Sequence, residues 1–233
     1  MNIVAKQSIY KKIIYTIILP LALCHSSFAS LSKDEWKDYI DGTVGKSNYY
    51  LYKETRNKFF NSSEKHRALD LGSGAGNEDV DLLTRGWDVV GVDASPRSGE
   101  IIKERAKGLN GHFSFLEADF RSAQLTGYYD FVMSFYSLPF GNKKELSLLV
   151  KNIGKHMKNG GIFAVTFFGY QHDFVKQGKA YGISKEELNN ILRSNQFNVT
   201  FFLNRIFDQK TFAGDPVHWD VFDVVAVKSA AES

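Results

Sequence analysis

Three glycines at alternate positions, Gly72, Gly74 and Gly76, follow a short apolar run at Ala68–Leu71. A second apolar run ends at Asp93, 21 residues after Gly72. Glycine tolerates the unusual backbone angles of a turn from strand into helix, and it lets a ligand approach the backbone closely. A carboxylate at the end of the next strand can accept hydrogen bonds from both hydroxyls of a ribose. The pattern predicts a nucleoside site, although the glycines alone leave open an ordinary tight turn.

The spacing of the glycines separates the classes of nucleoside site. Dinucleotide-binding folds use Gly-x-Gly-x-x-Gly, in which the third glycine lets the helix pack closely on the strand. Asn77 occupies the position of that third glycine here. A phosphate-binding loop needs Lys followed by Ser or Thr after its glycines, and no such pair follows. The residues therefore disfavour nicotinamide dinucleotides and nucleoside triphosphates.

The glycine segment resembles motif I of the class I S-adenosylmethionine-dependent methyltransferases, which has an acidic residue before the glycines. Asp70 stands at that place. Three later segments resemble the same family in order and spacing, and they are Phe113–Phe120, Tyr129–Pro139 and Lys158–Thr166. Among its members, the chain is similar to small-molecule methyltransferases of the tellurite-resistance type. The resemblance covers residues 68–166.

This resemblance implies S-adenosylmethionine as the cofactor and assigns a role to each motif. The glycine turn would carry the methionine part, Asp93 the ribose, and Asp119 with Phe120 the adenine. The cofactor-binding residues that it implies are Asp70, Gly72, Ser73, Gly74, Gly76, Asp93, Ala94, Asp119 and Phe120. The histidines are scattered without ligand spacing, so no metal site is expected.

Alternating strand and helix patterns predict an α/β fold with a doubly wound sheet. Several strands are near-continuous apolar runs, as expected when both faces of a parallel sheet are covered. No helical pattern separates the last two strands, so we expect an antiparallel hairpin to complete a seven-stranded, mostly parallel sheet. The expected strands are Arg67–Leu71, Asp88–Asp93, His112–Glu117, Tyr129–Phe135, Gly161–Phe167, Phe197–Leu203 and Val221–Val227.

Capping patterns predict the clearest helices. Asn142 with Glu145 precedes a periodic apolar stretch over Lys143–Met157, and Ser184 with Glu187 opens a helix that Asn195 can close. Residues 30–66, before the domain at residues 67–228, form a helical lid segment in this interpretation. A break is expected at Asp41–Thr43, and Tyr49, Tyr50 and Tyr52 follow it. These aromatic residues either cover the substrate or simply pack on the domain.

Residues 1–29 have the three-part pattern of a secretory signal peptide. Lys6, Lys11 and Lys12 precede an apolar run at Ile13–Cys24, and Ser27-Phe28-Ala29 supplies small residues for cleavage. The run of about 12 residues is too short to span a membrane, which takes roughly 20. Cleavage after Ala29 would export the protein and remove its single cysteine, Cys24. Lipidation at Cys24 and a misassigned start near Leu31, which would leave a cytoplasmic protein, are the alternatives.

The charges disfavour a nucleic-acid substrate. Outside the leader 26 basic residues face 26 acidic ones, and no stripe of Lys and Arg is present. We therefore expect a monomer that acts on a small-molecule acceptor and does not insert into a membrane beyond its leader. A catalytically silent cofactor-binding module and, against the signal of Asn77, a nicotinamide-dependent oxidoreductase are the alternatives.

Two residues are the candidates for the catalytic site, Tyr136 and His218. Tyr136 follows the fourth strand, where the family places substrate-facing residues. His218 follows a loop expected at Asp208–Val217 and can accept a proton near neutral pH, although a histidine bonded to a backbone carbonyl is the alternative. Further candidates for contact with the acceptor are Phe140, His172, Arg205 and Trp219.

Overall fold

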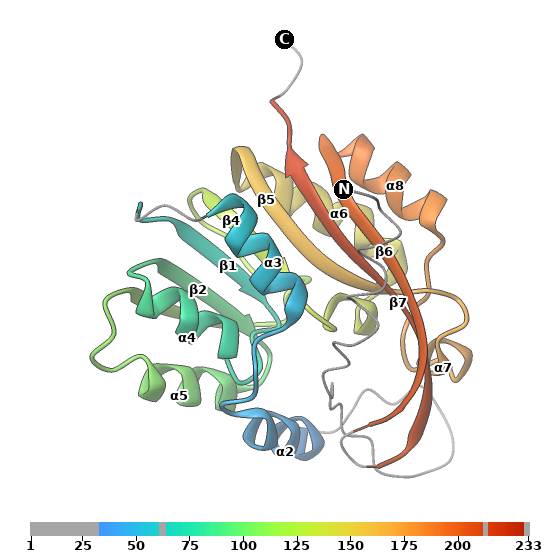
Figure 1. The fold of residues 1–233 in the computed structure, drawn as a ribbon, viewed down its shortest axis with the longest axis horizontal. Helices are drawn as coiled ribbons and strands as arrows, with labels where there is room; N and C mark the ends of the chain where they lie inside the picture. Colours follow the sequence, from blue (N-terminus) through green and yellow to red (C-terminus); the bar gives the residue numbers. More distant parts are fainter. Residues whose placement is uncertain (1–32, 61–63, 212–213, 231–233) are drawn as a thin grey trace.

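The computed structural model describes residues 33–60, 64–211 and 214–230. Its seven strands form one sheet in the order β3-β2-β1-β4-β5-β7-β6 (Figure 1). The pairings among β1 to β5 are parallel, and β7 runs antiparallel to both of its neighbours. The predicted doubly wound sheet with a C-terminal hairpin is confirmed. The strands are β1 (Arg67–Leu71), β2 (Asp88–Asp93), β3 (His112–Glu117), β4 (Tyr129–Ser134), β5 (Met157–Phe168), β6 (Phe197–Lys210) and β7 (Pro216–Lys228).

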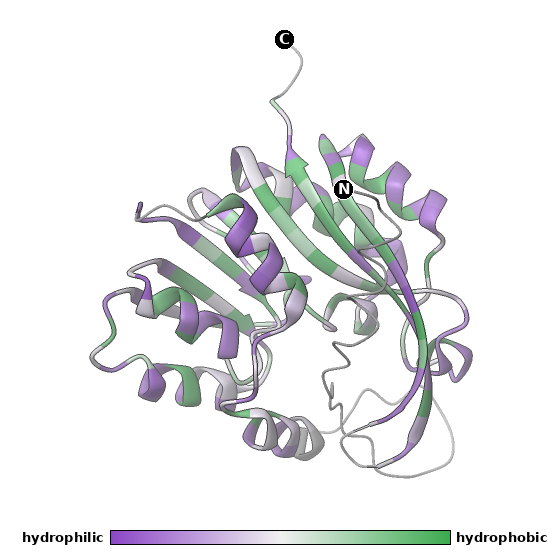
Figure 2. Cartoon of the chain, viewed as in Figure 1, coloured by the Kyte–Doolittle hydropathy of each residue, from purple (hydrophilic) through white to green (hydrophobic). Residues whose placement is uncertain are grey.

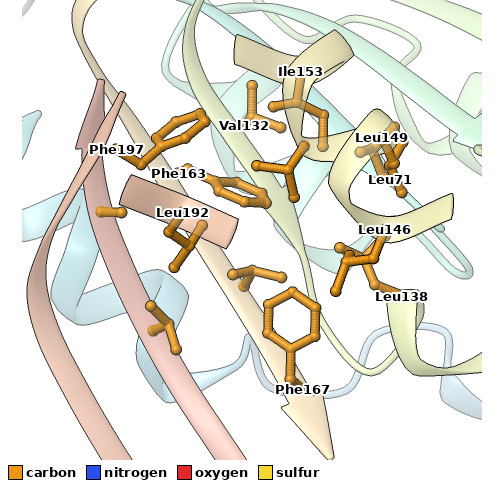
Figure 3. Packing of buried hydrophobic residues seen from close by; sticks show 14 of the residues in the cluster. Leu71, Val132, Leu138, Leu146, Leu149, Ile153, Phe163, Phe167, Leu192 and Phe197 are labelled. Atoms are coloured by element: carbon orange, nitrogen blue, oxygen red, sulfur yellow. The ribbon is translucent and has the colours of Figure 1, made fainter. Parts of the chain in front are cut away.

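Helices cover both faces of the sheet. Leu149 and Ile153 of α6 and Leu192 of α8 join the larger core on one face, together with Phe163 and Phe197 of the strands (Figure 3). A second core on the other face takes residues from α3 and α4. The α-helices are α2 (Lys33–Thr43), α3 (Tyr50–Phe59), α4 (Asn77–Thr84), α5 (Pro96–Arg105), α6 (Leu146–Lys155), α7 (Asp173–Lys176) and α8 (Lys185–Ser194), with short 3₁₀ turns η1 (Leu138–Phe140) and η2 (Lys143–Glu145).

The capping patterns mark real helix boundaries. Ser184 and Glu187 form a reciprocal capping box at the start of α8, and Asn195 ends that helix as predicted. Hydrophilic residues line the outer side of α8, whereas β5 and β7 are largely hydrophobic (Figure 2). The stretch predicted over Lys143–Met157 begins as the turn η2 and becomes α-helical only at Leu146.

The C-terminal hairpin is longer than predicted. β6 continues to Lys210 and β7 begins at Pro216, so half of the loop expected at Asp208–Val217 is strand. Inward residues still alternate with polar ones across this stretch, which keeps the two-residue period of a strand. The stacked rings of Phe207 and Trp219, with centroids 5.9 Å apart, are part of that inward row.

The N-terminal segment also differs in detail. α2 runs through Asp41–Thr43, where a break was predicted, and Gly45 then adopts a φ of 72° before α3. The expected leader at residues 1–29 lies outside the described residues. Within the described ranges, no helix is both long and apolar enough to cross a bilayer.

Candidate functional site

The three glycines of the motif form the turn between β1 and α4, and all three have positive φ angles. The angles are 83° at Gly72, 51° at Gly74 and 65° at Gly76, a region that residues with side chains rarely adopt. The amide of Gly72 donates to the carbonyl of Val92, 2.7 Å away, and so ties the turn to β2. The predicted glycine turn from strand into helix is therefore present.

The space around the three glycines differs. A Cβ at Gly72 would lie 2.2 Å from Oγ of Ser137, which follows β4, and one at Gly76 would lie 2.2 Å from Cγ1 of Ile102 on α5. A Cβ at Gly74 would meet nothing within 4 Å. Gly72 and Gly76 thus permit close packing, whereas Gly74 borders open space at the carboxyl ends of the strands, where sheets of this type bind ligands.

Asp93 ends β2 with its carboxylate directed at the glycine turn. Its Oδ2 accepts a hydrogen bond from the amide of Gly74 at 2.9 Å, and its Oδ1 accepts one from the amide of Ser95 at 2.8 Å. Burial raises the pKa of Asp93, and these two hydrogen bonds oppose the rise. A carboxylate has about four acceptor positions, so about two remain available to hydroxyl groups of a ligand.

Asp119 and Phe120 follow β3 at the same edge of the sheet as Asp93. The amide of Ala118 donates to the carbonyl of Asp93 at 3.0 Å, which brings the two strand ends together. Arg121 occupies the Asp119 carboxylate, donating from Nε at 2.8 Å and from its backbone amide at 2.9 Å. These bonds lower the pKa of Asp119. A ligand group that binds Asp119 must therefore replace part of the Arg121 contact.

Ser73 and Ala94, the two smallest predicted cofactor residues besides glycine, lie differently. Ser73 is buried, and its Oγ lies 3.4 Å from Oγ of Ser98 on α5. Its side chain therefore belongs to the packing beneath the turn, and only its backbone lines the turn. Ala94 follows Asp93 and is exposed.

Acidic groups gather at the beginning of α4. Asp70 of β1 is buried, and burial together with the neighbouring carboxyls of Asp79 and Glu78 raises its pKa well above the usual value. Burial also raises the pKa of Glu78, whose Oε1 accepts a hydrogen bond from the amide of Tyr49 at 2.7 Å. Among these acids, the sequence pattern indicates only Asp70.

Five side chains form a second polar group, which we call the tyrosine–arginine cluster: Tyr49, Tyr50, Tyr136, Arg205 and Asp223. Asp223 is fully buried on β7 and accepts hydrogen bonds from the hydroxyls of Tyr49, at 2.7 Å, and Tyr50. It also accepts a bond from Nε of Arg205, whose Nη2 donates to the hydroxyl of Tyr136 at 2.6 Å. The guanidinium lies 5.3 Å from the ring centre of Tyr50. The buried charges of the cluster are therefore paired.

Tyr136 has a strained backbone. Its φ of 58° is rare for a bulky residue, and such outliers concentrate at functional sites. Its amide donates to Oγ1 of Thr166 at 2.5 Å. The hydroxyls of Tyr136 and Tyr49 lie 3.1 Å apart. Because Tyr49 gives its proton to Asp223, Tyr136 is the donor in this pair. Burial raises the pKa of Tyr136 to about 12, so its hydroxyl is neutral.

Aromatic rings continue from Tyr136 to the N-terminal segment. The ring centroids of Trp219 and Phe168 lie 6.0 Å and 6.3 Å from that of Tyr136. Phe140 lies 5.8 Å from Phe168 and 5.9 Å from Trp36 of α2. α2 therefore contacts the segment after β4, close to the carboxyl ends of the parallel strands (Figure 1).

His172 is part of this aromatic group. It is fully buried, with its ring stacked on Phe168 at a centroid distance of 3.8 Å. Its Nδ1 accepts a hydrogen bond from the amide of Phe174, 3.1 Å away, at the start of α7. Burial lowers the pKa of His172 to about 3, so the ring is neutral at ordinary pH.

The structure does not bring His218 together with Tyr136. His218 lies within β7, and its Nδ1 is 2.8 Å from Oδ1 of Asp208 on β6. Successive residues of a strand point to opposite faces, so His218 lies on the face opposite Trp219, whose ring packs near Tyr136. The sequence predicted a loop before His218, and a loop does not fix the direction of a side chain. Because His218 lies in a strand, its side chain is directed away from Tyr136.

Two residues of this region carried no motif, yet the structure places them at its centre. Asp223 is an acid inside an apolar strand, a pattern that indicates a buried and paired carboxylate. Glu78 links the two polar groups through Tyr49.

Asn77 links the lid segment to the turn, because its side chain accepts from the amide of Gly45 at 2.9 Å and donates to the carbonyl of Thr43 at 2.9 Å.

Residues 68–161 match the family model described as a methyltransferase domain. Over these residues the chain is similar to S-adenosylmethionine-dependent methyltransferases, and its sheet has the class I methyltransferase fold. The order of its seven strands and its glycine turn both agree with this assignment.

Curated relatives resemble this chain over part of its length. Magnesium-protoporphyrin O-methyltransferase of Rhodobacter capsulatus is 34% identical over 100 residues, which is 42% of this chain and 44% of the relative. The probable S-adenosyl-L-methionine-dependent methyltransferase TehB of Haemophilus influenzae is 30% identical over 95 residues, 41% of this chain and 33% of the relative. The matches span less than half the length of both relatives.

Solved structures of the superfamily share the fold. TehB of Haemophilus influenzae has a TM-score of 0.65 at 17% identity, covering 83% of this chain and 67% of that one. Magnesium protoporphyrin IX methyltransferase of Synechocystis, solved with bound S-adenosylmethionine, has a TM-score of 0.60 at 17% identity, covering 88% of this chain and all of that one.

The residues at the glycine turn of this chain fit S-adenosylmethionine as the cofactor. Gly74 leaves space beside the turn, and Asp93 is held by two backbone amides with acceptor positions to spare. Asp70 places a buried carboxyl group at the end of β1, directly before the glycine turn. Asp119 fits once part of its Arg121 contact is replaced.

Proposed function

We propose that this chain is an S-adenosylmethionine-dependent methyltransferase that acts on a small-molecule acceptor. The observation that carries the proposal is the position of the Asp93 carboxylate, fixed by the amides of Gly74 and Ser95 beside the open side of the glycine turn. This arrangement suits a ribose with two free hydroxyls. It offers no cradle for a pyrophosphate, and the nicotinamide alternative is not favoured.

The acceptor would lie between the glycine turn and the tyrosine–arginine cluster. The supporting observation is that Ser137, next to strained Tyr136, reaches the Gly72 backbone, so the end of β4 borders the cofactor turn directly. The rings of Trp36, Phe140 and Phe168 pack against one another near this strand end, and aromatic walls with a few fixed polar groups are typical of small-molecule sites. The near-neutral body of the chain supports a small acceptor over a nucleic acid.

The cofactor supplies a methyl group already activated on a sulfonium, so this chain has to align the acceptor and exclude water. Tyr136 would align it with its ring, because its hydroxyl donates to Tyr49 and accepts from Arg205. Arg205 and Asp223 neutralise one another and hold the tyrosines in place. We do not assign the transfer of a proton to His218, which lies on the other face of β7.

Calorimetry and a methyl-transfer screen test the proposal. We expect the full chain to bind S-adenosylmethionine and S-adenosylhomocysteine with micromolar affinity and to bind NAD negligibly. Methyl transfer from labelled cofactor would then be screened against small carboxylic acids, phenols, amines, thiols and magnesium protoporphyrin, the compound in the name of one relative. Tight NAD binding without sulfonium binding would reject the proposal. Cofactor binding without transfer to any acceptor would favour a catalytically silent module.

The cellular location follows from the leader. We propose export if the pattern at residues 1–29 is a genuine signal peptide, and a cytoplasmic monomer otherwise. Export would separate the enzyme from the compartment where S-adenosylmethionine is made, so the cleavage state of the leader decides where activity is to be sought.

A further inference from the structure

Asp79 lies two residues into α4, where its carboxyl group is fully buried. Within the described part of the chain, no hydrogen-bond donor reaches either of its oxygens. A buried carboxylate without a donor is costly, because desolvation penalises the charged form. The group therefore needs either a proton of its own or a neighbour that supplies one.

The neighbour is Asp70 of β1, whose exposed fraction is 4%. After burial, the Asp79 carboxyl group is the main cause of the raised pKa of Asp70, which indicates that the two buried carboxyl groups are close neighbours. Two carboxylates cannot donate to one another, so this contact is a hydrogen bond only when one of the two groups is protonated. Like charges at such a short range in a buried place strongly favour the singly protonated pair.

The surroundings add little positive charge. Glu78 of α4 and Asp93 of β2 are further acids whose charges act on Asp79, and Arg105 of α5 is a base whose charge acts on it in the opposite direction. Arg105 directs Nη1 to the carbonyl of Ala75 at 2.6 Å and to Oδ1 of Asn77 at 2.9 Å, so it does not bond the pair. Burial raises the pKa of both Asp70 and Asp79.

The pair lies directly beneath the glycine turn. A Cβ at Gly76 would come within 3.2 Å of Oδ2 of Asp79, so Asp79 also fixes the last glycine of the turn. We propose that Asp70 and Asp79 share one proton, and that Asp79 is the positioning residue that orients the Asp70 carboxyl beneath the cofactor's amino-acid end. This inference rests on the proposed cofactor site, but the shared proton exists without cofactor.

Its first test uses the cofactor-free full chain. An acid whose folded-state pKa is raised stabilises the fold below its unfolded-state pKa, and this contribution is lost as the pH rises. Asp79→Asn keeps the size and supplies an N–H donor to Asp70, but it cannot ionise. We therefore expect the Tm of Asp79→Asn, relative to the parent, to increase between pH 5.5 and pH 8.5.

Asp81→Asn is the matched control on the same helix. Although burial raises its pKa, hydrogen bonds from Tyr52, Arg85 and Arg56 lower the pKa of Asp81 below its usual value. The group is then ionised in both states across this pH range, so the Asp81→Asn offset in Tm should be constant. A constant offset for Asp79→Asn as well would overturn the shared proton.

The second test measures S-adenosylhomocysteine binding. We expect Asp79→Asn to stay within about threefold of the parent, because the donor to Asp70 is retained, and Asp79→Leu to lose at least tenfold. If Asp79→Leu does not fold, Asp70→Leu takes its place. Equal losses in Asp79→Asn and Asp79→Leu would mean that Asp79 acts as an anion and would overturn its positioning role. Failure of the parent chain to bind would instead count against the proposed function, and the pH comparison would still stand.

Discussion

The hydroxyl of Tyr49 lies 2.7 Å from Oδ1 of Asp223, although 174 residues separate them along the chain. Tyr49 is the cap residue of α3, and Asp223 lies in the last strand of the sheet. The contact closes the tyrosine–arginine cluster between the two ends of the described chain. The amide of the same Tyr49 donates to Glu78 beside the glycine turn, so a single residue touches both polar groups.

Asp93→Ala should weaken S-adenosylmethionine binding by about 2 kcal/mol, because the bidentate acceptor for the ribose is lost. Titration calorimetry on the full chain measures the change. Asp88→Ala is the matched control, since Asp88 begins the same strand, pairs with Lys65 and lies at the opposite end from the glycine turn. Equal affinity in the Asp93→Ala variant and the control would remove the ribose assignment.

Tyr136→Phe should keep most turnover, and Tyr136→Ala should reduce it about 100-fold or more with little change in cofactor affinity. The reason is that the hydroxyl is committed to Tyr49 and Arg205, which leaves the ring to align the acceptor. Loss of the hydroxyl should cost about 1 kcal/mol of unfolding free energy. Steady-state kinetics with calorimetry separates the two effects. A large loss of turnover in Tyr136→Phe would assign the chemistry to the hydroxyl instead.

His172→Asn should make the protein less sensitive to mild acid. Burial lowers the folded-state pKa of His172 to about 3, so its stabilising contribution is present above the unfolded-state pKa of about 6.5 and is lost as the pH falls. Between pH 6.5 and pH 5 the parent should lose on the order of 1 to 2 kcal/mol that the variant keeps. Asparagine preserves the acceptor for the amide of Phe174. Denaturant unfolding at each pH measures the difference.

His112→Asn is the control for that experiment, because the side chain of His112 is exposed on the edge strand β3. Its unfolding free energy should follow the pH dependence of the parent chain. If His172→Asn also follows the parent, the ring of His172 is not buried in the neutral form.

Expression of the full chain in a bacterial host should give a mature protein that begins at Ser30. The reason is the lysine-rich start, the short apolar run and the small residues that end at Ala29. Mass spectrometry of the periplasmic and cytosolic fractions measures it, with Ala29→Phe as a variant that should keep the leader. Full-length protein confined to the cytosol would contradict the prediction and restore a cytoplasmic enzyme.

The sequence predicted the glycine turn and the end of β2 well because their signals are local. Gly72, Gly74, Gly76 and Asp93 are fixed by backbone angles and strand ends, and the structure places them together. The positions of the candidate acceptor residues depend on contacts between strands that are far apart in the sequence, and no local sequence pattern predicts such contacts. His218 illustrates the difference, because its side-chain direction follows from the register of β7 on β6. Asp79 and Asp223 were missed since their partners come from other strands and helices.

The tyrosine–arginine cluster draws four of its five members from outside residues 68–161, and only Tyr136 lies within that range. In the proposed function, the part of the chain that matches the family model would hold the methyl donor, and the flanking segments would shape the site of the acceptor. Substitutions at either end could redirect such an enzyme to a new compound and leave its donor affinity unchanged. A change of acceptor would then need no new domain, only substitutions in a few side chains that meet between the start of α3 and the C-terminal hairpin.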